Sequence, residues 1–211
     1  IGPNGAGKST LFNAILGLVA HEGTIRCARR PAYVPQGEQA AADFPVTALD
    51  VALMGRYPHR RWWQRLSAGD HAAAQRALDT VGMGEHADCT FGTLSGGQRQ
   101  RVILARALAH DRPVILLDEP MTGVDSVSEH AIDAAIAALR DEGRTLLVAT
   151  HDLSGAARTC DRLLFLNGRL VADGTPAQTF TPETLQRTYA GAAVMLTAPA
   201  GPPLALLDDA H

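Results

Sequence analysis

Directly after the first residue, Gly2–Thr10 has the sequence GPNGAGKST. This stretch fits the pattern GxxxxGK[ST], in which glycines let backbone N–H groups approach phosphate oxygens, Lys8 neutralises their charge and the Ser9 hydroxyl can ligate Mg²⁺. Apolar residues then recur at helical spacing, so the sequence predicts a phosphate-binding loop that feeds a helix. The residues expected to hold the phosphates are Gly2, Asn4, Gly5, Gly7, Lys8, Ser9 and Thr10.

The pattern by itself also arises in ordinary glycine-rich turns. A phosphate loop follows a β-strand, and this chain starts at the loop, with Ile1 as its first residue. Further motifs are therefore needed to separate the two interpretations.

The composition describes a globular chain. Its 211 residues are 46% hydrophobic and 19% charged, with a net charge of −3, so one domain with a real core is expected and a polyanion such as nucleic acid is not the expected partner. The longest aliphatic stretches, such as Val114–Leu117, fall far short of the ~20 residues of a membrane helix. Cys27, Cys89 and Cys160 lack metal-ligand spacing and are expected to be reduced thiols.

The second half predicts an α/β fold. Two short apolar runs, Val114–Leu117 and Thr145–Ala149, are typical of buried strands, and between them Ser126 and Glu129 are expected to form a capping box for an amphipathic helix. A strand, a helix and a strand in this order predict a parallel sheet. Before them, Thr47–Gly82 is alanine-rich with helical periodicity, which predicts a helical lobe. Within it, Ser67 and Asp70 are spaced as a capping box before a helix at His71–Val81.

The last third predicts a hairpin and a helix. Arg162–Leu166 and Arg169–Val171 flank Asn167–Gly168, the signature of two strands joined by a two-residue turn. Thr181 and Pro182 open a helix that should run to Tyr189. The remaining tail is rich in Ala, Pro and Gly and is expected to be loosely ordered.

Two carboxylates follow the first buried strand. Asp118 and Glu119 should lie at the carboxyl edge of the sheet, where open α/β sheets bind ligands. There Asp118 would hold Mg²⁺ through water, and Glu119 would polarise a water that attacks a γ-phosphate. The alternative is a solvated acidic turn. The glycine-rich loop earlier in the chain favours the Mg²⁺-binding and catalytic interpretation over it.

A second glycine-rich segment, Leu94–Gln98 with the sequence LSGGQ, precedes a predicted helix whose periodicity includes Val102, Ala105 and Leu108. Amides and a hydroxyl at a helix N-terminus are a natural anion site, although such a start can also be a plain turn.

Taken together, GPNGAGKST, LSGGQ with Gln100-Arg101, and LLDEP at Leu116–Pro120 resemble the ATP-binding subunits of ABC transporters. The resemblance covers nearly the whole chain, with the motifs in the family's order. It implies a P-loop NTPase (RecA-like) core at about 1–42 and 111–190, an inserted helical subdomain with the signature motif at about 43–110, and a flexible tail at 191–211. It also implies that the first strands and an adenine-stacking aromatic residue are missing from this chain.

The resemblance assigns a role to each motif residue. Gln36 contacts Mg²⁺ and senses the membrane partner, His151 contacts the γ-phosphate, and Asp125 belongs to a loop that crosses a dimer interface. ATP lies between the phosphate loop of one subunit and Ser95, Gly97 and Gln98 of the other, so hydrolysis requires a homodimer. The implied catalytic residues are Glu119 and His151, and the implied Mg²⁺ ligands are Ser9, Gln36 and Asp118.

A narrower resemblance concerns the substrate. Asp43–Thr47, Asp50-Val51, Leu53–Tyr57 and Phe180–Pro182 are similar to the subunits that drive manganese and zinc uptake. This implies integral-membrane permease subunits as partners, an extracytoplasmic metal-binding protein as an indirect partner, and a place at the cytoplasmic face of the membrane. We interpret His59–Trp63 as a loop at the partner interface rather than a metal or lipid site.

Two readings compete with an importer ATPase. One is an inactive, N-terminally truncated remnant, and the other is a soluble ABC ATPase outside transport. Met121-Thr122 also departs from the residues that relatives often carry at this place.

Overall fold

The computed structural model describes residues 1–27, 29–36, 45–59, 61, 63–189, 193–196 and 204–207. The chain forms two compact units: unit 1 consists of Ile1–Thr24 and Ala149–His211, and unit 2 of Ile25–Val148. The predicted division into a core and a helical subdomain stays a prediction.

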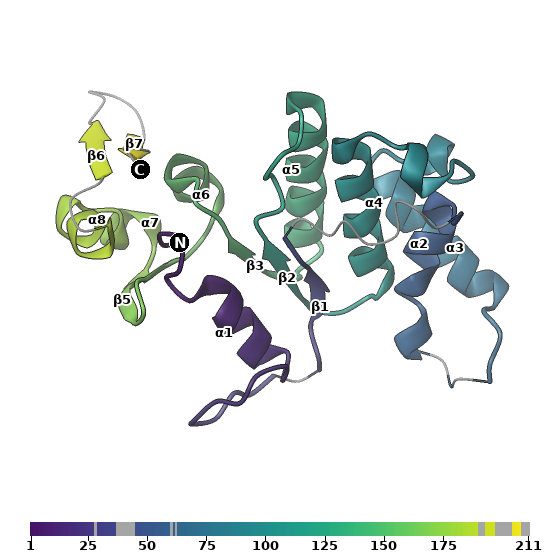
Figure 1. Ribbon diagram of the computed structural model, residues 1–211, viewed down its shortest axis with the longest axis horizontal. Helices are drawn as coiled ribbons and strands as arrows, with labels where there is room; N and C mark the ends of the chain where they lie inside the picture. The colour runs from purple at the N-terminus through teal and green to yellow at the C-terminus, as the bar shows by residue number, and fades with distance from the viewer. Residues whose placement is uncertain are drawn as a thin grey trace. The chain divides into compact units, whose positions relative to one another are not determined.

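Unit 2 is built on a small sheet in the order β1-β2-β3, formed by Ala32–Val34, Val114–Asp118 and Thr145–Ala149 (Figure 1). Strands β1 and β2 run parallel, with Ala32 opposite Ile115 and Val34 opposite Leu117. Strand β2 is buried from Ile115 to Asp118, as expected for a strand covered on both faces. The two strands predicted here are thus confirmed, and β1 and β2 bring their carboxyl ends to the same edge.

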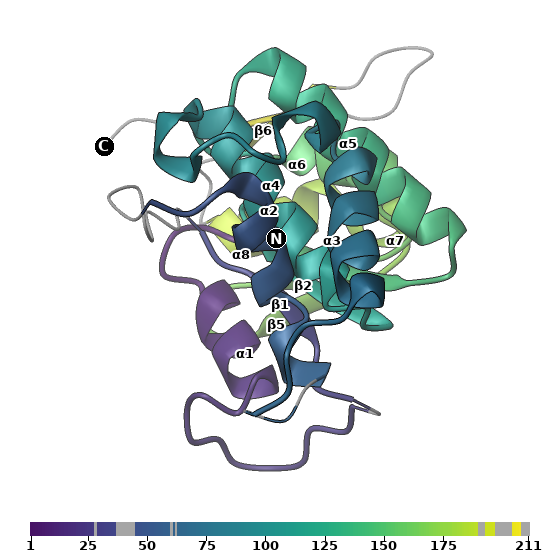
Figure 2. The same ribbon diagram turned by 90° about the vertical axis from the view of Figure 1, so that its right-hand side faces the viewer.

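The described part of unit 2 also contains the helices α2 (Ala48–Met54), α3 (Ala68–Thr80), α4 (Gly96–Ala109) and α5 (Ser126–Asp141), with 3-10 turns at Tyr57–His59, Gly84–His86 and Phe91–Thr93. Helices α2, α3 and α4 pack against one another (Figure 2), which confirms the predicted helices of this region.

Side chains define where these helices begin. The predicted capping box of Ser67 and Asp70 is present at α3. At α5 the predicted box was wrong, because Asp125, not Ser126, is the N-cap, and its carboxylate accepts from the Ser128 N–H at 2.9 Å. The helix starts one residue earlier than a cap at Ser126 would allow, since an aspartate caps at least as well as a serine.

The core of unit 2 joins the sheet to these helices. Fully buried side chains include Leu78, Leu104, Ile115, Leu117 and Ile132. Each such side chain stabilises the fold by about 1.5–3 kcal/mol relative to exposure. The strand ends that carry the acidic residues are therefore fixed by a continuous apolar interior.

Unit 1 contains the first helix and the C-terminal third of the chain. Its helices are α1 (Lys8–Ile15), α6 (Leu153–Thr159), α7 (Pro176–Thr179) and α8 (Pro182–Tyr189). Its strands pair antiparallel as β4 (Leu163–Leu166) with β5 (Leu170–Gly174), and β6 (Ala193–Leu196) with β7 (Leu204–Leu207). The predicted hairpin and last helix are confirmed.

The hairpin turn differs from its prediction. Three residues, Asn167, Gly168 and Arg169, separate β4 from β5, and the strand register shifts between Phe165 and Leu166. Gly168 has a φ of 66°, in the left-handed region. A glycine in this conformation is typical of a three-residue turn next to a bulge, which is why the two-residue turn was the wrong choice.

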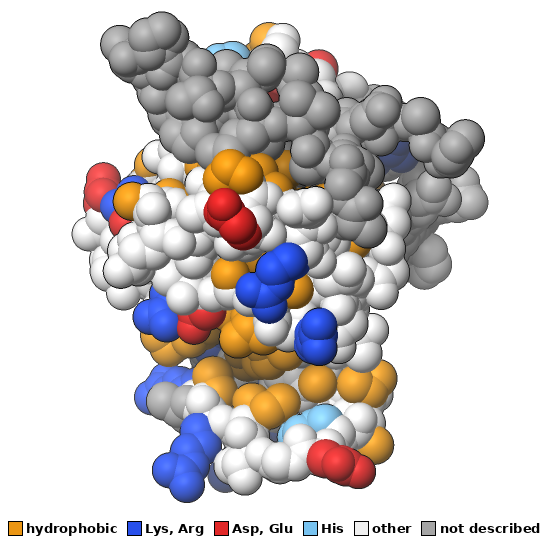
Figure 3. Space-filling model, turned by 90° about the vertical axis from the view of Figure 1, so that its left-hand side faces the viewer, with side chains coloured by type: hydrophobic (Ala, Val, Ile, Leu, Met, Phe, Trp, Pro, Cys, Tyr) orange, Lys and Arg blue, Asp and Glu red, His pale blue; other side chains and the backbone are white. Residues whose placement is uncertain are grey.

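A second apolar cluster fills unit 1 and includes Ile1, Leu153, Phe165, Phe180 and Leu185. The Phe165 and Phe180 rings lie 6.5 Å apart between centroids. Large apolar side chains also stay exposed, among them Leu18 and Leu170, and Figure 3 shows hydrophobic side chains at the surface among charges of both signs. Among the described residues no helix is long and apolar enough to cross a membrane.

Candidate active site

The glycine-rich loop of unit 1 turns sharply into α1. Gly5 and Gly7 have φ values of 78° and 97°, and the Ala6 N–H donates to the Pro3 carbonyl at 3.1 Å. Helix α1 begins at Lys8 with no side-chain cap and no acidic residue in its first turn. An uncapped helix N-terminus carries partial positive charge, so this end of α1 suits an anion.

The Lys8 side chain bends back from the start of α1 toward the glycine-rich loop before it. The residue is only 8% exposed, and its Nζ donates to the carbonyls of Gly2 at 2.6 Å and Pro3 at 3.3 Å. These bonds hold the ammonium group over the loop. The following Ser9 and Thr10 are exposed in the first turn of α1. A buried cation beside backbone amides is the arrangement that binds phosphate oxygens.

The β4–β5 hairpin supports this loop from behind. Ile1 bonds Leu164 and Leu166 in the pattern of a parallel strand, at 2.8 Å in both directions, and the Gly168 N–H donates to the Ala6 carbonyl at 3.0 Å. A Cβ on Gly2 would collide with the Leu166 carbonyl. Gly2 is therefore required by close packing, whereas Gly7 is required by its left-handed backbone.

The acidic pair lies at the carboxyl end of β2 in unit 2, where Asp118 is the last residue of the strand and Glu119 follows it. Asp118 is 2% exposed; its Oδ2 accepts from the Tyr33 hydroxyl at 3.3 Å, and its Oδ1 is buried with no hydrogen-bond partner. The Glu119 Oε2 accepts from Gln36 Nε2 at 2.9 Å and from Thr122 Oγ1 at 3.0 Å. The parallel register of β1 and β2 is what brings Gln36 to Glu119 across 83 positions of sequence.

The LSGGQ segment forms the N-terminus of α4. Ser95 Oγ accepts from the Gln98 N–H at 3.2 Å, and Gln98 Oε1 accepts from the Ser95 N–H at 2.9 Å, which is a capping box. Gly97 is packed against the cap of α5, where an added Cβ would collide with Asp125 and Ser128.

Hydrogen bonds from Ser128, first from its N–H and then from its hydroxyl, lower the pKa of the Asp125 carboxyl below its ordinary value. Asp125 thus stands next to the signature motif of its own chain, with both carboxylate oxygens engaged.

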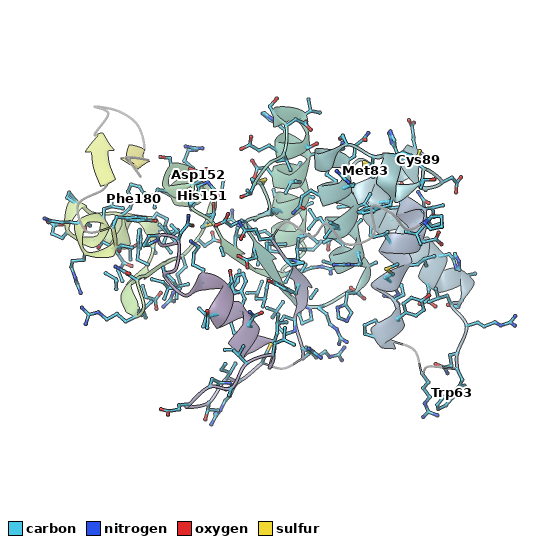
Figure 4. All side chains as sticks on the ribbon, in the orientation of Figure 1. Trp63, Met83, Cys89, His151, Asp152 and Phe180 are labelled. Carbon is cyan, nitrogen blue, oxygen red and sulfur yellow. The ribbon has the colours of Figure 1, made fainter. Side chains whose placement is uncertain are left out.

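His151 lies in unit 1, between the end of β3 and the start of α6, and is exposed (Figure 4). The neighbouring Asp152 caps α6 through the Gly155 N–H at 2.9 Å, and the Asp152 N–H donates to Thr150 Oγ1 at 3.0 Å. This pair of bonds fixes the backbone on the C-terminal side of the histidine.

The structure thus gathers the predicted residues into groups. The loop residues from Gly2 to Thr10 form one group in unit 1, which also holds His151. Unit 2 holds two groups, one made by Gln36, Asp118 and Glu119, and one made by Ser95, Gly97, Gln98 and Asp125. Two residues predicted for the uptake resemblance, Asp43 and Phe44, lie outside the described residues, as do Arg60 and Trp62 of the interface loop.

Sequence reasoning did not find Tyr33 or the role of Thr122. Tyr33 contacts Asp118 only because β1 and β2 are neighbours, so no local signal marks it. Thr122 stands three residues after Glu119, a spacing at which a turn brings a hydroxyl back to the first residue, and this signal could have been used.

Comparison with known proteins identifies the family. Residues 1–122 match the family model described as ABC transporter. The chain belongs to the ABC transporter ATP-binding family. As an ABC ATPase it binds ATP and hydrolyses it to power transport, and subunits of this family work with membrane permeases.

Known proteins align with this ABC ATPase over most of its length. It is 44% identical over 199 residues to the manganese transport system ATP-binding protein MntB of Halalkalibacterium halodurans, covering 90% of this chain and 80% of the relative. It is 46% identical over 200 residues to the zinc transport system ATP-binding protein TroB of Treponema pallidum, covering 90% and 75%. A solved metal-chelate type ABC transporter in an inward-facing conformation matches with a TM-score of 0.86 and 27% identity, covering 98% of this chain and 84% of that one.

Proposed function

We propose that this ABC ATPase energises an importer for manganese or zinc. The proposal is supported by the two relatives whose names refer to manganese and to zinc transport, at 44% and 46% identity. The observation that carries the catalytic part is the pairing of Gln36 with Glu119 beside a buried Asp118. Both relatives are named as ATP-binding proteins of transport systems, which favours this function over that of a soluble ABC ATPase outside transport.

The nucleotide phosphates belong in the loop of unit 1. Backbone amides at the start of α1 donate to phosphate oxygens, Lys8 adds a positive charge, and the glycines keep side chains out of the way. The full set proposed for this role is Gly2, Asn4, Gly5, Gly7, Lys8, Ser9 and Thr10.

The chemistry of the donor groups fits Mg²⁺. Asp118 Oδ1 is a buried carboxylate oxygen without a hydrogen-bond partner, and a hard cation would satisfy it. Ser9 and Gln36 add a hydroxyl and an amide oxygen, which are also hard ligands. Gln36 can serve both roles, because it donates to Glu119 through Nε2 and keeps Oε1 as a ligand atom. A Mg²⁺ ion held by these residues would supply positive charge against the charge that develops on the phosphates.

Glu119 is the proposed base. Its half-buried carboxylate, oriented by two donors on Oε2, accepts a proton from the attacking water. His151 is proposed to contact the γ-phosphate, from a position fixed by Thr150 and Asp152. Together they would supply the base and a hydrogen-bond donor for phosphoryl transfer to water.

The assembly that completes the site is a homodimer. Ser95, Gly97 and Gln98 would close over the nucleotide of the partner subunit, and Asp125 would lie at the interface. We place the helical region at about 43–110 against the permease at the cytoplasmic face of the membrane, with a metal-binding protein delivering substrate on the other side. Closure around ATP and reopening after hydrolysis would drive the permease.

Glu119→Gln tests the catalytic assignment in the complete subunit. The amide keeps the size of the side chain but cannot accept a proton, so we expect ATP binding and dimerisation with turnover reduced at least about a hundredfold. Binding is measured by calorimetry and turnover by phosphate release. Turnover that matches the unmodified subunit would remove Glu119 from this role.

The transported ion is tested in the complete transporter, reconstituted in vesicles with its binding protein. We expect ATP-dependent accumulation of Mn²⁺ or Zn²⁺, measured as metal content of the vesicles, with the Glu119→Gln transporter as the matched control. Accumulation of Fe²⁺ in preference to both ions, or of none of the three, would contradict the proposed substrate.

A further inference from the structure

Thr122 holds the carboxylate of Glu119 from within the same turn. Its Oγ1 donates to Glu119 Oε2 at 3.0 Å, and its N–H donates to the Glu119 carbonyl at 3.1 Å. Glu119 itself has a φ of 48°, one of two non-glycine residues with positive φ in the described chain. Both bonds thus stabilise an unusual backbone and a defined side-chain direction at one residue.

The two donors on Glu119 Oε2 differ in where they come from. Gln36 belongs to the segment after β1, and its amide is also proposed to ligate Mg²⁺. Thr122 belongs to the same turn as Glu119, and its N–H donates to the Glu119 carbonyl. The hydroxyl can therefore keep the carboxylate oriented when the bond from Gln36 lengthens or breaks.

The location of Thr122 argues against a packing role. Its side chain is exposed and belongs to neither apolar cluster. Exposed threonines contribute little to stability unless their hydroxyl has a specific partner. Here that partner is the proposed catalytic carboxylate, and a bond to a charged group is stronger than a neutral one.

We infer that Thr122 is a positioning residue for ATP hydrolysis, which acts by holding Glu119 Oε2 so that the carboxylate faces the attacking water. The inference rests on the proposed role of Glu119. Thr122 does not touch nucleotide in this scheme, so it should affect the rate of the chemical step and leave ATP affinity unchanged.

The test compares Thr122→Val, which has nearly the same shape but no hydroxyl, with Thr122→Ser, which restores the hydroxyl. Both are made in the complete transporter. We expect Thr122→Val to lower kcat about tenfold, with KM and the Kd for ATP within twofold of the unmodified protein, and Thr122→Ser to recover at least half of the lost rate.

Thr80→Val is the matched control. Thr80 is also exposed, and its Oγ1 donates to a backbone carbonyl, that of Arg76, at 2.9 Å on α3. We expect its kcat to stay within twofold of the unmodified protein. Thermal unfolding midpoints of all variants show whether each is folded, and Thr122→Ala replaces the valine variant if that one does not fold.

A double variant separates this inference from the proposed function. If Thr122 acts through Glu119, adding Thr122→Val to Glu119→Gln lowers the residual rate no further. Full turnover by Glu119→Gln alone would overturn the assignment of Glu119. A slow Glu119→Gln together with a Thr122→Val kcat within twofold of normal, or with a serine variant as slow as the valine variant, would overturn the positioning role alone.

Discussion

Two helices of this ABC ATPase begin in glycine-rich segments, but only one of the two has a side-chain cap at its N-terminus. Helix α1 starts at Lys8 with no side-chain cap, whereas α4 starts after Ser95 with a complete capping box. Both ends carry partial positive charge. In α1 no side chain caps these amides, whereas in α4 the Gln98 N–H already donates to Ser95 Oγ. Within a single subunit, the start of α1 is therefore better suited to receive a phosphate.

The glycines of the two segments also have different reasons to be there. Gly7 has a φ of 97° and open space around its Cα, so a side chain there would meet strain and no neighbour. Gly97 has no positive φ, and its hydrogen faces Asp125 and Ser128 so closely that a Cβ would collide with them. Glycine is therefore required for backbone conformation at one helix start and for close packing at the other.

The largest effect that this comparison predicts is on Lys8. Lys8→Ala removes the charge that lies over the α1 loop, and we expect ATP affinity to fall more than about a hundredfold, as measured by calorimetry. Lys8→Arg is the control for charge, and it should recover only part of the affinity because the larger, planar group does not match the bonds that Lys8 makes to the Gly2 and Pro3 carbonyls. Unchanged binding by Lys8→Ala would mean that α1 is no phosphate site.

Ser95→Ala should act differently. Removing the cap of α4 should lower the free energy of unfolding by about 1 kcal/mol, measured by denaturant titration, while the ATP affinity of a single subunit stays within twofold. Ser95→Thr is the control, because threonine can also cap. If Ser95→Ala lost ATP affinity in the monomer, α4 and α1 would share one function and the contrast would fail.

The smallest effect concerns acid stability at the cap of α5, beside Gly97. The folded-state pKa of Asp125 is lowered, so its contribution is present above the ordinary carboxyl pKa of about 4 and is lost as pH falls through the lower folded value. Asp125→Asn keeps an acceptor without titrating. We therefore expect its thermal midpoint to decline less steeply than that of the unmodified protein below pH about 4.

Ser128→Ala is the companion variant, since it removes the hydroxyl that donates to Asp125 Oδ2 at 3.0 Å and should bring the pKa nearer its ordinary value. Identical pH slopes for Asp125→Asn and the unmodified protein would rule out this titration as a source of acid sensitivity.

Local chemistry made much of this protein predictable. The buried run Val114–Leu117, the helix that follows the glycine loop and the capping box of Ser67 were all found from short stretches, because burial, helical periodicity and caps are properties of neighbouring residues. The two wrong predictions each chose between alternatives of similar stability. Asp125, not Ser126, caps α5, and the β4–β5 turn has three residues, not two.

The glycine-rich loop, the acidic pair and the signature segment could be recognised from short stretches of residues. The contacts of Tyr33 with Asp118 and of Gln36 with Glu119, the bond from Gly168 to the glycine-rich loop, and the packing of Gly97 on the cap of α5 are visible only in the folded chain. Such contacts depend on strand register and helix packing, which are set by burial over the whole unit and leave no mark at a fixed spacing in the chain.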